Sequence, residues 1–552
     1  MNAVNPASAL NPALAAGEAL ATPAGRQRPQ PALPATELPL ATKVFAFGVM
    51  CVGFFIALLD IQIVSASLAD IGGGLSASPD ETAWVQTSYL IAEIIVIPLS
   101  GWLTRVMSTR WLFAFSAIGF TFTSLLCGWA WDIQSMIAFR FLQGFLGGSM
   151  IPTVYTTAFF YFVGNQRVVA AALVGGLSSL APTLGPTIGG WITDNYSWHW
   201  LFFVNLVPGI FVAVVVPLLV KIDKADYSLL RGADYLGMLL MAVFLGCLEY
   251  TLEEGPRWDW FGDDTILTTA WVTAITGPLF IWRSLAAAHP ILDLRALKSL
   301  NFSLGCFFSF VTGIGIFATI YLTPVFLSRV RGFSAYEIGC AVFSTGLFQV
   351  SAIPFYTFLA RRIDLRWLMM FGLACFAAGM WQFTYITSDW GWQELLLPQG
   401  LRGFAQQFAL APIITLTLGG LPPDRLKLAS GLFNLMRNLG GAIGIAVCGT
   451  VLIDRTNQHY LHIAENLSAG SELATARLQA LTQYLANQMD GDTVGAQAAA
   501  LKALFSRTWG EALTQTFADA FLLIALCFVV AFVMVPLMRK VAPPKAPTAD
   551  AH

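Results

Sequence analysis

Residues 175–194 read GGLSSLAPTLGPTIGGWITD, a run of small and apolar residues that contains Pro182 and Pro186. The glycines and serines recur at helical spacing, which lets a neighbouring helix approach closely. Each proline removes a backbone hydrogen bond and permits a bend. The stretch therefore predicts a closely packed transmembrane helix that bends during motion. Its candidate hinge residues are Gly175, Pro182, Gly185, Pro186, Gly189, Gly190 and Asp194.

The rest of the chain has the composition of a membrane protein. Of its 552 residues, 56% are hydrophobic and only 11% are charged, whereas soluble domains carry about 25% charged residues. Apolar runs of about 20 residues recur, which is the length of helix that crosses a hydrocarbon core of roughly 30 Å. Lipid cannot satisfy open backbone groups, and the strict alternation of a membrane β-barrel is absent. These features predict an all-α polytopic membrane protein.

The apolar runs predict fourteen transmembrane helices, an even number that places both termini on one side. The predicted spans are 44–66, 82–103, 111–130, 135–158, 168–191, 199–220, 235–252, 265–284, 301–324, 336–358, 367–387, 393–418, 428–453 and 513–537.

Lysine and arginine concentrate in the predicted loops that share a side with the N-terminus, as in Arg361, Arg362 and Arg366. Cytoplasmic loops carry this excess, so both termini are predicted to be cytoplasmic. Residues 1–43 are rich in Ala and Pro and predict a disordered tail, and 538–552 form a short second tail. The long outer loop 454–512 has helical spacing of apolar residues and predicts short amphipathic helices on the membrane surface or against a partner.

A few ionisable residues fall inside the predicted spans. Each such group costs several kcal/mol in lipid unless it has a partner, a water-filled cavity or a function. We predict that Asp60, Glu93 and Arg140 form a proton-coupling site, because an acid whose access to water alternates can carry protons. The alternative is a set of ion pairs that only hold helices together. The other intramembrane charges are Glu249, Arg402 and Arg437.

Several other activities lack support in the sequence. The eight cysteines form no CxxC pair, and the five histidines have no metal-ligand spacing. No phosphate-binding GxxxxGK[ST], HExxH or GxSxG motif occurs. We therefore expect no metal, no cofactor, no catalytic residues and no nucleic-acid partner. Energy for movement across the membrane would come from an ion gradient or from the substrate gradient itself, with sodium as the alternative to protons.

Specific motifs resemble those of the major facilitator superfamily. RFLQGFLGG (140–148) is similar to its fourth-span motif, and the stretch 175–194 is similar to its antiporter motif. ALLDIQIVSASLADI (57–71) resembles the first-span signature of the fourteen-helix drug:proton antiporters of the EmrB/QacA type. The resemblance runs from about residue 44 to 540. Further matches are WHWLFFVNLVPG (198–209), EEGPRWDWF (253–261) and SGLFNLMRNLGGAIG (430–444).

This resemblance implies a major facilitator fold with a six-helix bundle at 44–220, two extra helices at 235–284 and a second six-helix bundle at 301–537. A weak internal repeat agrees: LQGFLGGSMIP (142–152) is similar to LRGFAQQFALAP (401–412), as expected for halves related by pseudo-twofold symmetry.

The resemblance also implies proton-driven export of apolar or cationic small molecules by alternating access. It further implies a place in the bacterial inner membrane, with a periplasmic adaptor and an outer-membrane channel as partners. Aromatic side chains suit such ligands. The alternatives are an importer of a small organic nutrient on the same fold and, more remotely, a membrane enzyme. Candidate cavity residues are Phe54, Tyr89, Phe317, Tyr321, Trp381, Phe404 and Phe408.

Two departures from the family pattern matter. The loop after the second span reads GWLTRVMSTRW (101–111), where the superfamily has GxLxDRxGRR. Arg105 replaces the expected acid and Ser108 the second glycine, which puts the usual charge-relay gate in doubt. In the first span, Gln62 replaces the usual threonine.

Overall fold

The computed structural model describes residues 39–287, 290–421, 423–465, 467, 471–489 and 492–540. Most of the predicted N-terminal tail 1–43 and C-terminal tail 538–552 lies outside these residues. Every regular element in the described part of the chain is a helix.

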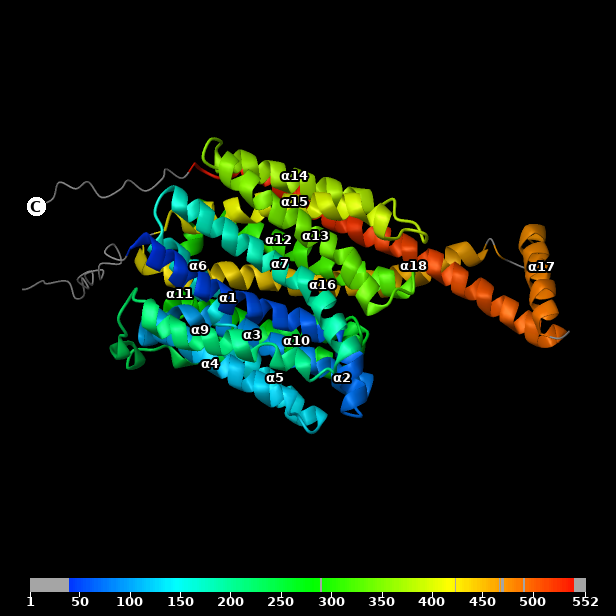
Figure 1. Ribbon diagram of the computed structural model, residues 1–552, viewed down its shortest axis with the longest axis horizontal. Helices are drawn as coiled ribbons and strands as arrows, with labels where there is room; N and C mark the ends of the chain where they lie inside the picture. The colour runs from blue at the N-terminus through cyan, green and yellow to red at the C-terminus, as the bar shows by residue number, and fades with distance from the viewer. Residues whose placement is uncertain are drawn as a thin grey trace, which may run out of the picture. The chain divides into compact units, whose positions relative to one another are not determined.

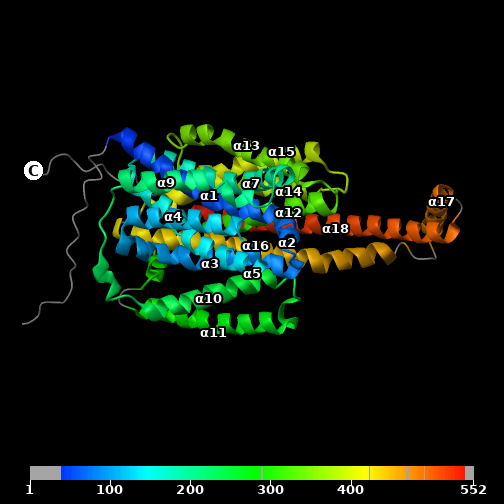
Figure 2. The ribbon, with the colours of Figure 1, turned by 60° about the horizontal axis from the view of Figure 1, so that its bottom comes forward.

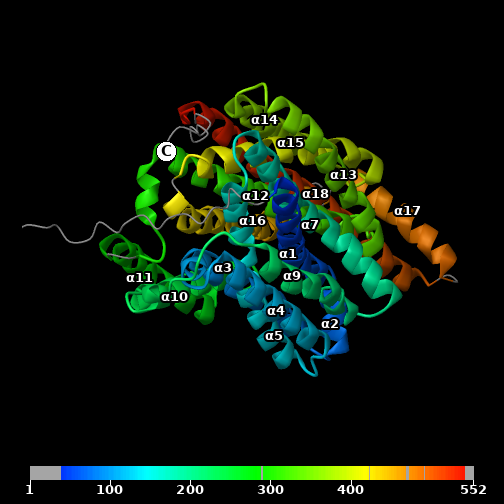
Figure 3. The same ribbon diagram turned by 60° about the vertical axis from the view of Figure 1, so that its left-hand side comes forward.

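The first bundle consists of helices from the N-terminal part of the chain, and Figure 3 shows them grouped together. Its helices are α1 (Leu40–Ala66), α2 (Leu68–Gly74), α3 (Pro79–Met107), α4 (Thr109–Gly128), α5 (Ile133–Gly147), α6 (Met150–Tyr161), α7 (Asn165–Asn195), α8 (Trp200–Phe203) and α9 (Leu206–Leu219).

The second bundle comes from the C-terminal part of the chain. Its helices are α12 (Leu300–Arg329), α13 (Ala335–Leu359), α14 (Leu365–Phe383), α15 (Trp392–Leu418), α16 (Pro423–Glu465) and α18 (Thr493–Met534). The second membrane-spanning helix of each bundle begins with the same capping box, Ser78 with Glu81 on α3 and Ser334 with Glu337 on α13. In this arrangement the serine and glutamate side chains satisfy free backbone N–H groups of the first turn. The shared start agrees with an internal repeat.

The predicted spans correspond to these helices. Among the described residues, 11 helices are long and apolar enough to cross a membrane. The three other predicted spans fall on α14, on α15 and on the α5–α6 pair. That pair is interrupted at Gly148 and Ser149.

Helices α10 (Tyr235–Glu254) and α11 (Asp264–Ala286) form a hairpin between the two bundles in sequence. They pack against each other, and α10 also packs against α3 and α16. Figure 2 shows this hairpin beside α3. The pair corresponds to the two predicted extra helices.

The segment 454–512 differs from the expected loop of short helices. α16 continues to Glu465, and α18 already begins at Thr493, so residues 495–510 belong to a 42-residue helix. Only α17 (Glu472–Gln488) is a separate short helix, and it contacts α18. Figure 1 shows α16 and α18 running on toward α17. The apolar spacing predicted helices in this segment. It did not show that α16 and α18 extend from the membrane spans into the segment.

Glycines allow α7 to pack closely against α1 in the first bundle and α16 to pack closely against α12 in the second. A Cβ atom on Gly189 of α7 would lie 2.7 Å from the backbone oxygen of Ile63 in α1. A Cβ on Gly444 of α16 would lie 3.0 Å from Cα of Ile314 in α12. Because such distances leave no room for a side chain, both seams depend on glycine. Helix α7 also contains Pro182 and Pro186, both of which are buried, and it continues unbroken through them.

Candidate transport site

Asp60 of α1 lies in a buried hydrogen-bond network inside the first bundle. Its Oδ2 accepts a hydrogen bond from Arg140 Nη1 of α5 at 2.5 Å, and both side chains are 0% exposed. Its Oδ1 accepts from Asn205 Nδ2 at 2.6 Å and from Gln143 Nε2 at 3.3 Å. A buried charge is stable only when it is paired and hydrogen-bonded, and both conditions hold here.

Arg140 is fixed by three further contacts. Its Nε donates to the backbone oxygen of Val85 at 3.2 Å, and Nη1 also donates to Gln143 Oε1 at 2.7 Å. Its guanidinium carbon lies 4.2 Å from the ring centroid of Tyr89. Tyr89, a predicted cavity residue, is therefore a support for Arg140 in this structure. Arg140 Nη2 has no hydrogen-bond partner among the described residues.

Sequence reasoning did not single out Asn205 or Ser124 for this network. Asn205 Nδ2 also donates to Ser124 Oγ at 3.0 Å, and Ser124 Oγ donates to the backbone oxygen of Phe202 at 3.0 Å. The available signal was a lone asparagine in the otherwise apolar run LFFVNLVPG (201–209).

Arg402 of α15 is the corresponding cation of the second bundle, but its partners are neutral. It is 2% exposed. Nη1 donates to Thr319 Oγ1, and Nη2 donates to Thr345 Oγ1 at 2.9 Å and to Gln399 Oε1 at 3.2 Å. No described carboxylate forms an ion pair with it, and its Nε lacks a described partner. The arginine and glutamine are three residues apart in both bundles, in opposite order: Arg140 precedes Gln143, whereas Gln399 precedes Arg402.

Glu93 and Arg437 lie where the bundles meet. Asn438 Nδ2 of α16 donates to Glu93 Oε1 of α3 at 3.4 Å, and Arg437 Nη1 donates to Tyr155 Oη of α6 at 2.6 Å. Glu93 lies one helical turn after Tyr89 on α3, and the ring of Tyr89 packs against Arg140. Glu93 therefore lies near the Asp60 network, but its hydrogen bond goes to the other bundle.

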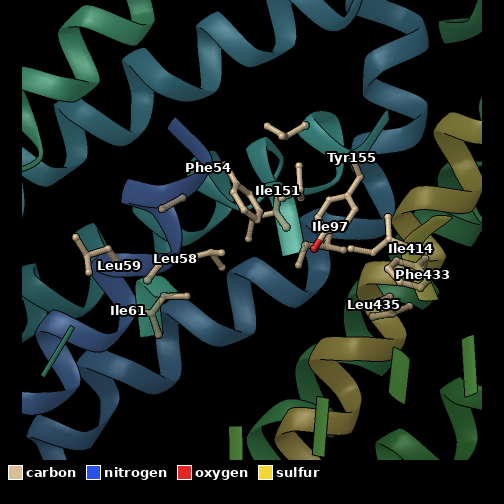
Figure 4. Packing of buried hydrophobic residues seen from close by; sticks show 14 of the residues in the cluster. Phe54, Leu58, Leu59, Ile61, Ile97, Ile151, Tyr155, Ile414, Phe433 and Leu435 are labelled. Atoms are coloured by element: carbon tan, nitrogen blue, oxygen red, sulfur yellow. The ribbon is translucent and has the colours of Figure 1, made fainter. Parts of the chain in front are cut away.

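Tyr155 connects apolar side chains of both bundles. Its ring centroid lies 5.9 Å from that of Phe54 in α1 and 6.1 Å from that of Phe433 in α16. Figure 4 shows Tyr155 between Phe54 and the side chains of Phe433 and Ile414. The bundles therefore meet through aromatic packing as well as through hydrogen bonds.

The other predicted cavity residues are dispersed. Phe404 and Phe408 stack at 5.1 Å between centroids, and Phe408 also packs on Tyr356. Trp381 is 52% exposed on α14. Phe317 packs against a small apolar cluster formed by Ile316, Ile320 and Leu410, and Tyr321 is partly buried. The structure does not gather the seven predicted aromatics around one cavity.

Helix α7 contacts both bundles with its predicted hinge residues. Gly185 and Gly189 face α1, whereas a Cβ on Gly175 would lie 3.6 Å from Leu410 of α15. Two glutamines of the second bundle donate to α7 backbone oxygens: Gln349 to Gly176 at 3.3 Å and Gln407 to Ala172 at 3.0 Å. Gly190 is buried as well, and Asp194 is exposed at the end of the helix.

A carboxylate from a different segment lies next to the altered loop 101–111. Both oxygens of Asp223, which follows α9, accept from the Thr109 backbone N–H, at 2.9 and 3.1 Å. Asp223 Oδ2 also pairs with Lys427 Nζ of α16. Asp223 thus places a carboxylate at the end of this loop and forms an ion pair between the bundles.

Residues 50–445 and 305–546 match the model of the Major Facilitator Superfamily. The chain belongs to this superfamily. Its helical fold agrees with solved superfamily members: the proton:xylose symporter XylE has a TM-score of 0.56 at 11% identity, covering 90% of this chain and 96% of that one. The human organic anion transporter MFSD10 has a TM-score of 0.54 at 13% identity, covering 89% of this chain and 100% of that one. The predicted fold class is confirmed.

Three curated superfamily transporters narrow the relationship. The chain is 38% identical to the colistin resistance protein EmrB of Acinetobacter baumannii, covering 90% of this chain and 96% of that protein. It is 33% identical to the multidrug export protein EmrB of Escherichia coli K12, covering 75% and 81%. It is 30% identical to the fatty acid resistance protein FarB of Neisseria gonorrhoeae, covering 83% and 90%. The predicted EmrB-type transporter is confirmed.

Proposed function

We propose that this superfamily transporter exports amphipathic and apolar compounds in exchange for protons. The names of its relatives refer to multidrug export and to resistance against colistin and fatty acids, which favours export over nutrient import. The observation that supports proton coupling is the ion pair between Asp60 and Arg140. Both side chains are sealed from water inside the first bundle.

The proposed coupling step begins with a proton on Asp60. A hydronium ion gives its proton to Asp60 Oδ2 and remains as water, and the site changes from a neutral ion pair to a net cation. Arg140 then lacks its counter-ion in a medium of low dielectric, which costs several kcal/mol. Protonation therefore destabilises the sealed arrangement and favours a state in which water reaches the site. Substrate competes with this proton for the water-accessible site, so substrate binding releases the proton and restores the pair, which yields exchange.

Glu93 and Arg437 couple this event to the movement of the bundles. Glu93 interacts electrostatically with Arg140 and is hydrogen-bonded to Asn438 of the opposite bundle. When Asp60 loses its negative charge, the positive charge of Arg140 is left uncompensated close to Glu93, and this acts on a contact between the bundles. The aromatic seam at Tyr155 would open in the same movement and expose rings that bind flat, apolar or cationic molecules.

The ion pair between Asp223 and Lys427 holds the predicted cytoplasmic ends of the bundles together. Thr156 Oγ1 and Ser430 Oγ lie 2.7 Å apart nearby and join α6 to α16. In other superfamily members the loop that corresponds to 101–111 has a gating function. We assign this function here to the contacts of Asp223 with Lys427 and of Thr156 with Ser430. The Asp223–Lys427 pair must break whenever the space between the bundles opens to the cytoplasm.

The location and partners form a further part of the proposal. We place the chain in the bacterial inner membrane with both termini cytoplasmic, so α17 lies on the periplasmic side. Leu473 and Tyr484 of α17 are 80% and 60% exposed, which supports contact with a periplasmic adaptor that leads to an outer-membrane channel. A pull-down with a variant lacking 472–488 should lose the adaptor, and equal recovery with this variant would exclude α17 as the contact.

Transport by purified protein in proteoliposomes tests the central proposal. With ethidium as a flat cationic probe, an imposed proton gradient should drive its accumulation against its own gradient. A protonophore should abolish accumulation, and an equal sodium gradient should not replace the proton gradient. Accumulation that persists with the protonophore and follows sodium would overturn proton coupling.

A further inference from the structure

Helix α10 belongs to neither bundle, yet one of its faces contains buried acids. Only 28% of the most apolar 18-residue stretch of α10 is buried, so most of the helix faces outward. Glu249 and Glu254 are nevertheless 5% and 4% exposed. A Cβ on Gly246 would lie 3.4 Å from Ile95 of α3, and Glu249 follows three residues later on the same face. The acids are therefore buried toward α3.

Glu249 has neither a cation nor a full set of hydrogen bonds. Its Oε2 has no hydrogen-bond partner, and no described lysine or arginine forms an ion pair with it. Glu253 lies one helical turn further along α10 and adds a second carboxylate. Arg437 of α16 donates to Tyr155, and the charged residues of α11 lie in its first and last turns. An ionised carboxylate would be unstable among these neighbours.

The acidic face of α10 begins at a pocket. A cavity of about 270 Å³, with room for several water molecules, is lined by residues that include Asp80, Trp84, Tyr250 and Glu254. Glu254 Oε1 accepts from Thr87 Oγ1 of α3 at 3.0 Å. The pocket lies at the end of α10 that the predicted orientation places outside.

Four carboxylates thus connect this pocket with the contact between the bundles. Glu254 lines the pocket, Glu253 precedes it, and Glu249 lies one helical turn from Glu253 on α10. Helix α10 packs against α3 and α16, which carry Glu93 and Asn438. Glu93 is hydrogen-bonded to Asn438 of the second bundle. None of the first three has a function in the coupling step at Asp60.

We propose that α10 forms a proton-entry route from this outer pocket to Glu93, with Glu249 as its central proton-binding residue. The proposal rests on the proposed proton-coupled function. A hydronium ion in the pocket gives its proton to Glu254 and remains as water. At each later step one carboxylic O–H bond breaks and one forms, through side-chain rotation or a bridging water. The extra helix pair then has a function in energy coupling.

Glu249→Gln tests the route, because glutamine has the shape of a protonated glutamic acid but cannot release the proton. In proteoliposomes driven by a proton gradient, ethidium accumulation should slow at least about tenfold, the scale of a lost proton-transfer group. Ethidium affinity, measured by fluorescence at equilibrium, should stay unchanged. Asp264→Asn, at an exposed acid in the first turn of α11, is the matched control and should transport like wild type.

Two comparisons separate this route from a structural role and from the proposed function itself. Glu249→Asp keeps a carboxyl group and should recover most of the rate, whereas a packing defect would affect both variants alike. Acidifying the outer solution should partly restore a slow Glu254→Gln variant. Wild-type rates in Glu249→Gln at every outer pH would overturn the route. Absence of proton-driven accumulation in the wild-type protein would instead overturn the proposed function.

Discussion

Arg140 and Arg402 occupy related places in the two bundles but have different neighbours. Arg140 pairs with the carboxylate of Asp60, whereas Arg402 donates to Thr319, Thr345 and Gln399, which are all neutral. The first arrangement changes its net charge when one proton binds, and the second keeps a fixed positive charge. The difference teaches that each bundle has a buried arginine with a glutamine three residues away, in opposite order, and that among the described residues only Arg140 of the two pairs with a carboxylate. We therefore propose the first bundle as the site of proton coupling.

Removing the acid should produce the largest effect. Asp60→Asn keeps the shape of the side chain but leaves Arg140 buried without a counter-ion, which costs about 3–5 kcal/mol of stability. Proton-driven accumulation of ethidium in proteoliposomes should fall to the level of empty vesicles. Asp70→Asn, at an exposed acid on α2, should accumulate ethidium like wild type. Accumulation by Asp60→Asn at the wild-type rate would exclude Asp60 as the coupling residue.

The glycine seams should show the next effect. Gly189→Leu and Gly444→Leu both place a side chain against a neighbouring helix, and overpacking of this kind costs about 1–3 kcal/mol. We expect similar losses of melting temperature in detergent but a larger loss of transport for Gly189→Leu, because α7, unlike α16, contains two prolines in its interior, which permit a bend. Equal transport losses would show that the two seams have the same function.

Arg402→Met should weaken the second bundle without uncoupling transport. The change removes hydrogen bonds to neutral oxygens, at a cost of about 1–3 kcal/mol, and it leaves no buried carboxylate unpaired. Arg140→Met would leave Asp60 without its cation and should cost more, about 3–5 kcal/mol. Thermal unfolding in detergent compares the two variants. An Arg402→Met protein that folds normally but loses its proton dependence would contradict the proposal that proton coupling occurs at Asp60 and Arg140.

Trp381→Ala should have the smallest effect of the series. Trp381 is 52% exposed on α14, and substitutions at such sites usually change stability by less than about 0.5 kcal/mol. Ethidium affinity and transport should match wild type. A clear loss of affinity would show that this face of α14 binds substrate.

Much of the fold could be predicted from the sequence because lipid imposes simple rules on apolar length. Those rules located the helices and the costly charges, including Asp60, Arg140 and Arg402. They did not show which charge meets which, because a hydrogen bond such as that from Asn438 to Glu93 joins residues 345 positions apart. Neutral partners such as Asn205 and Thr319 have no sequence signal of comparable strength. The aromatic cavity residues were the weakest prediction, since a ring in an apolar run packs equally well against lipid, a helix or a ligand.

Proton release on substrate binding tests the central claim most directly. Ethidium is added to purified protein in weakly buffered detergent solution, and the pH change is recorded for wild type, Asp60→Asn and Arg402→Met. The account predicts release by wild type and by Arg402→Met, and none by Asp60→Asn despite retained ethidium binding. Equal proton release by Asp60→Asn and wild type would show that the exchanged proton is bound elsewhere.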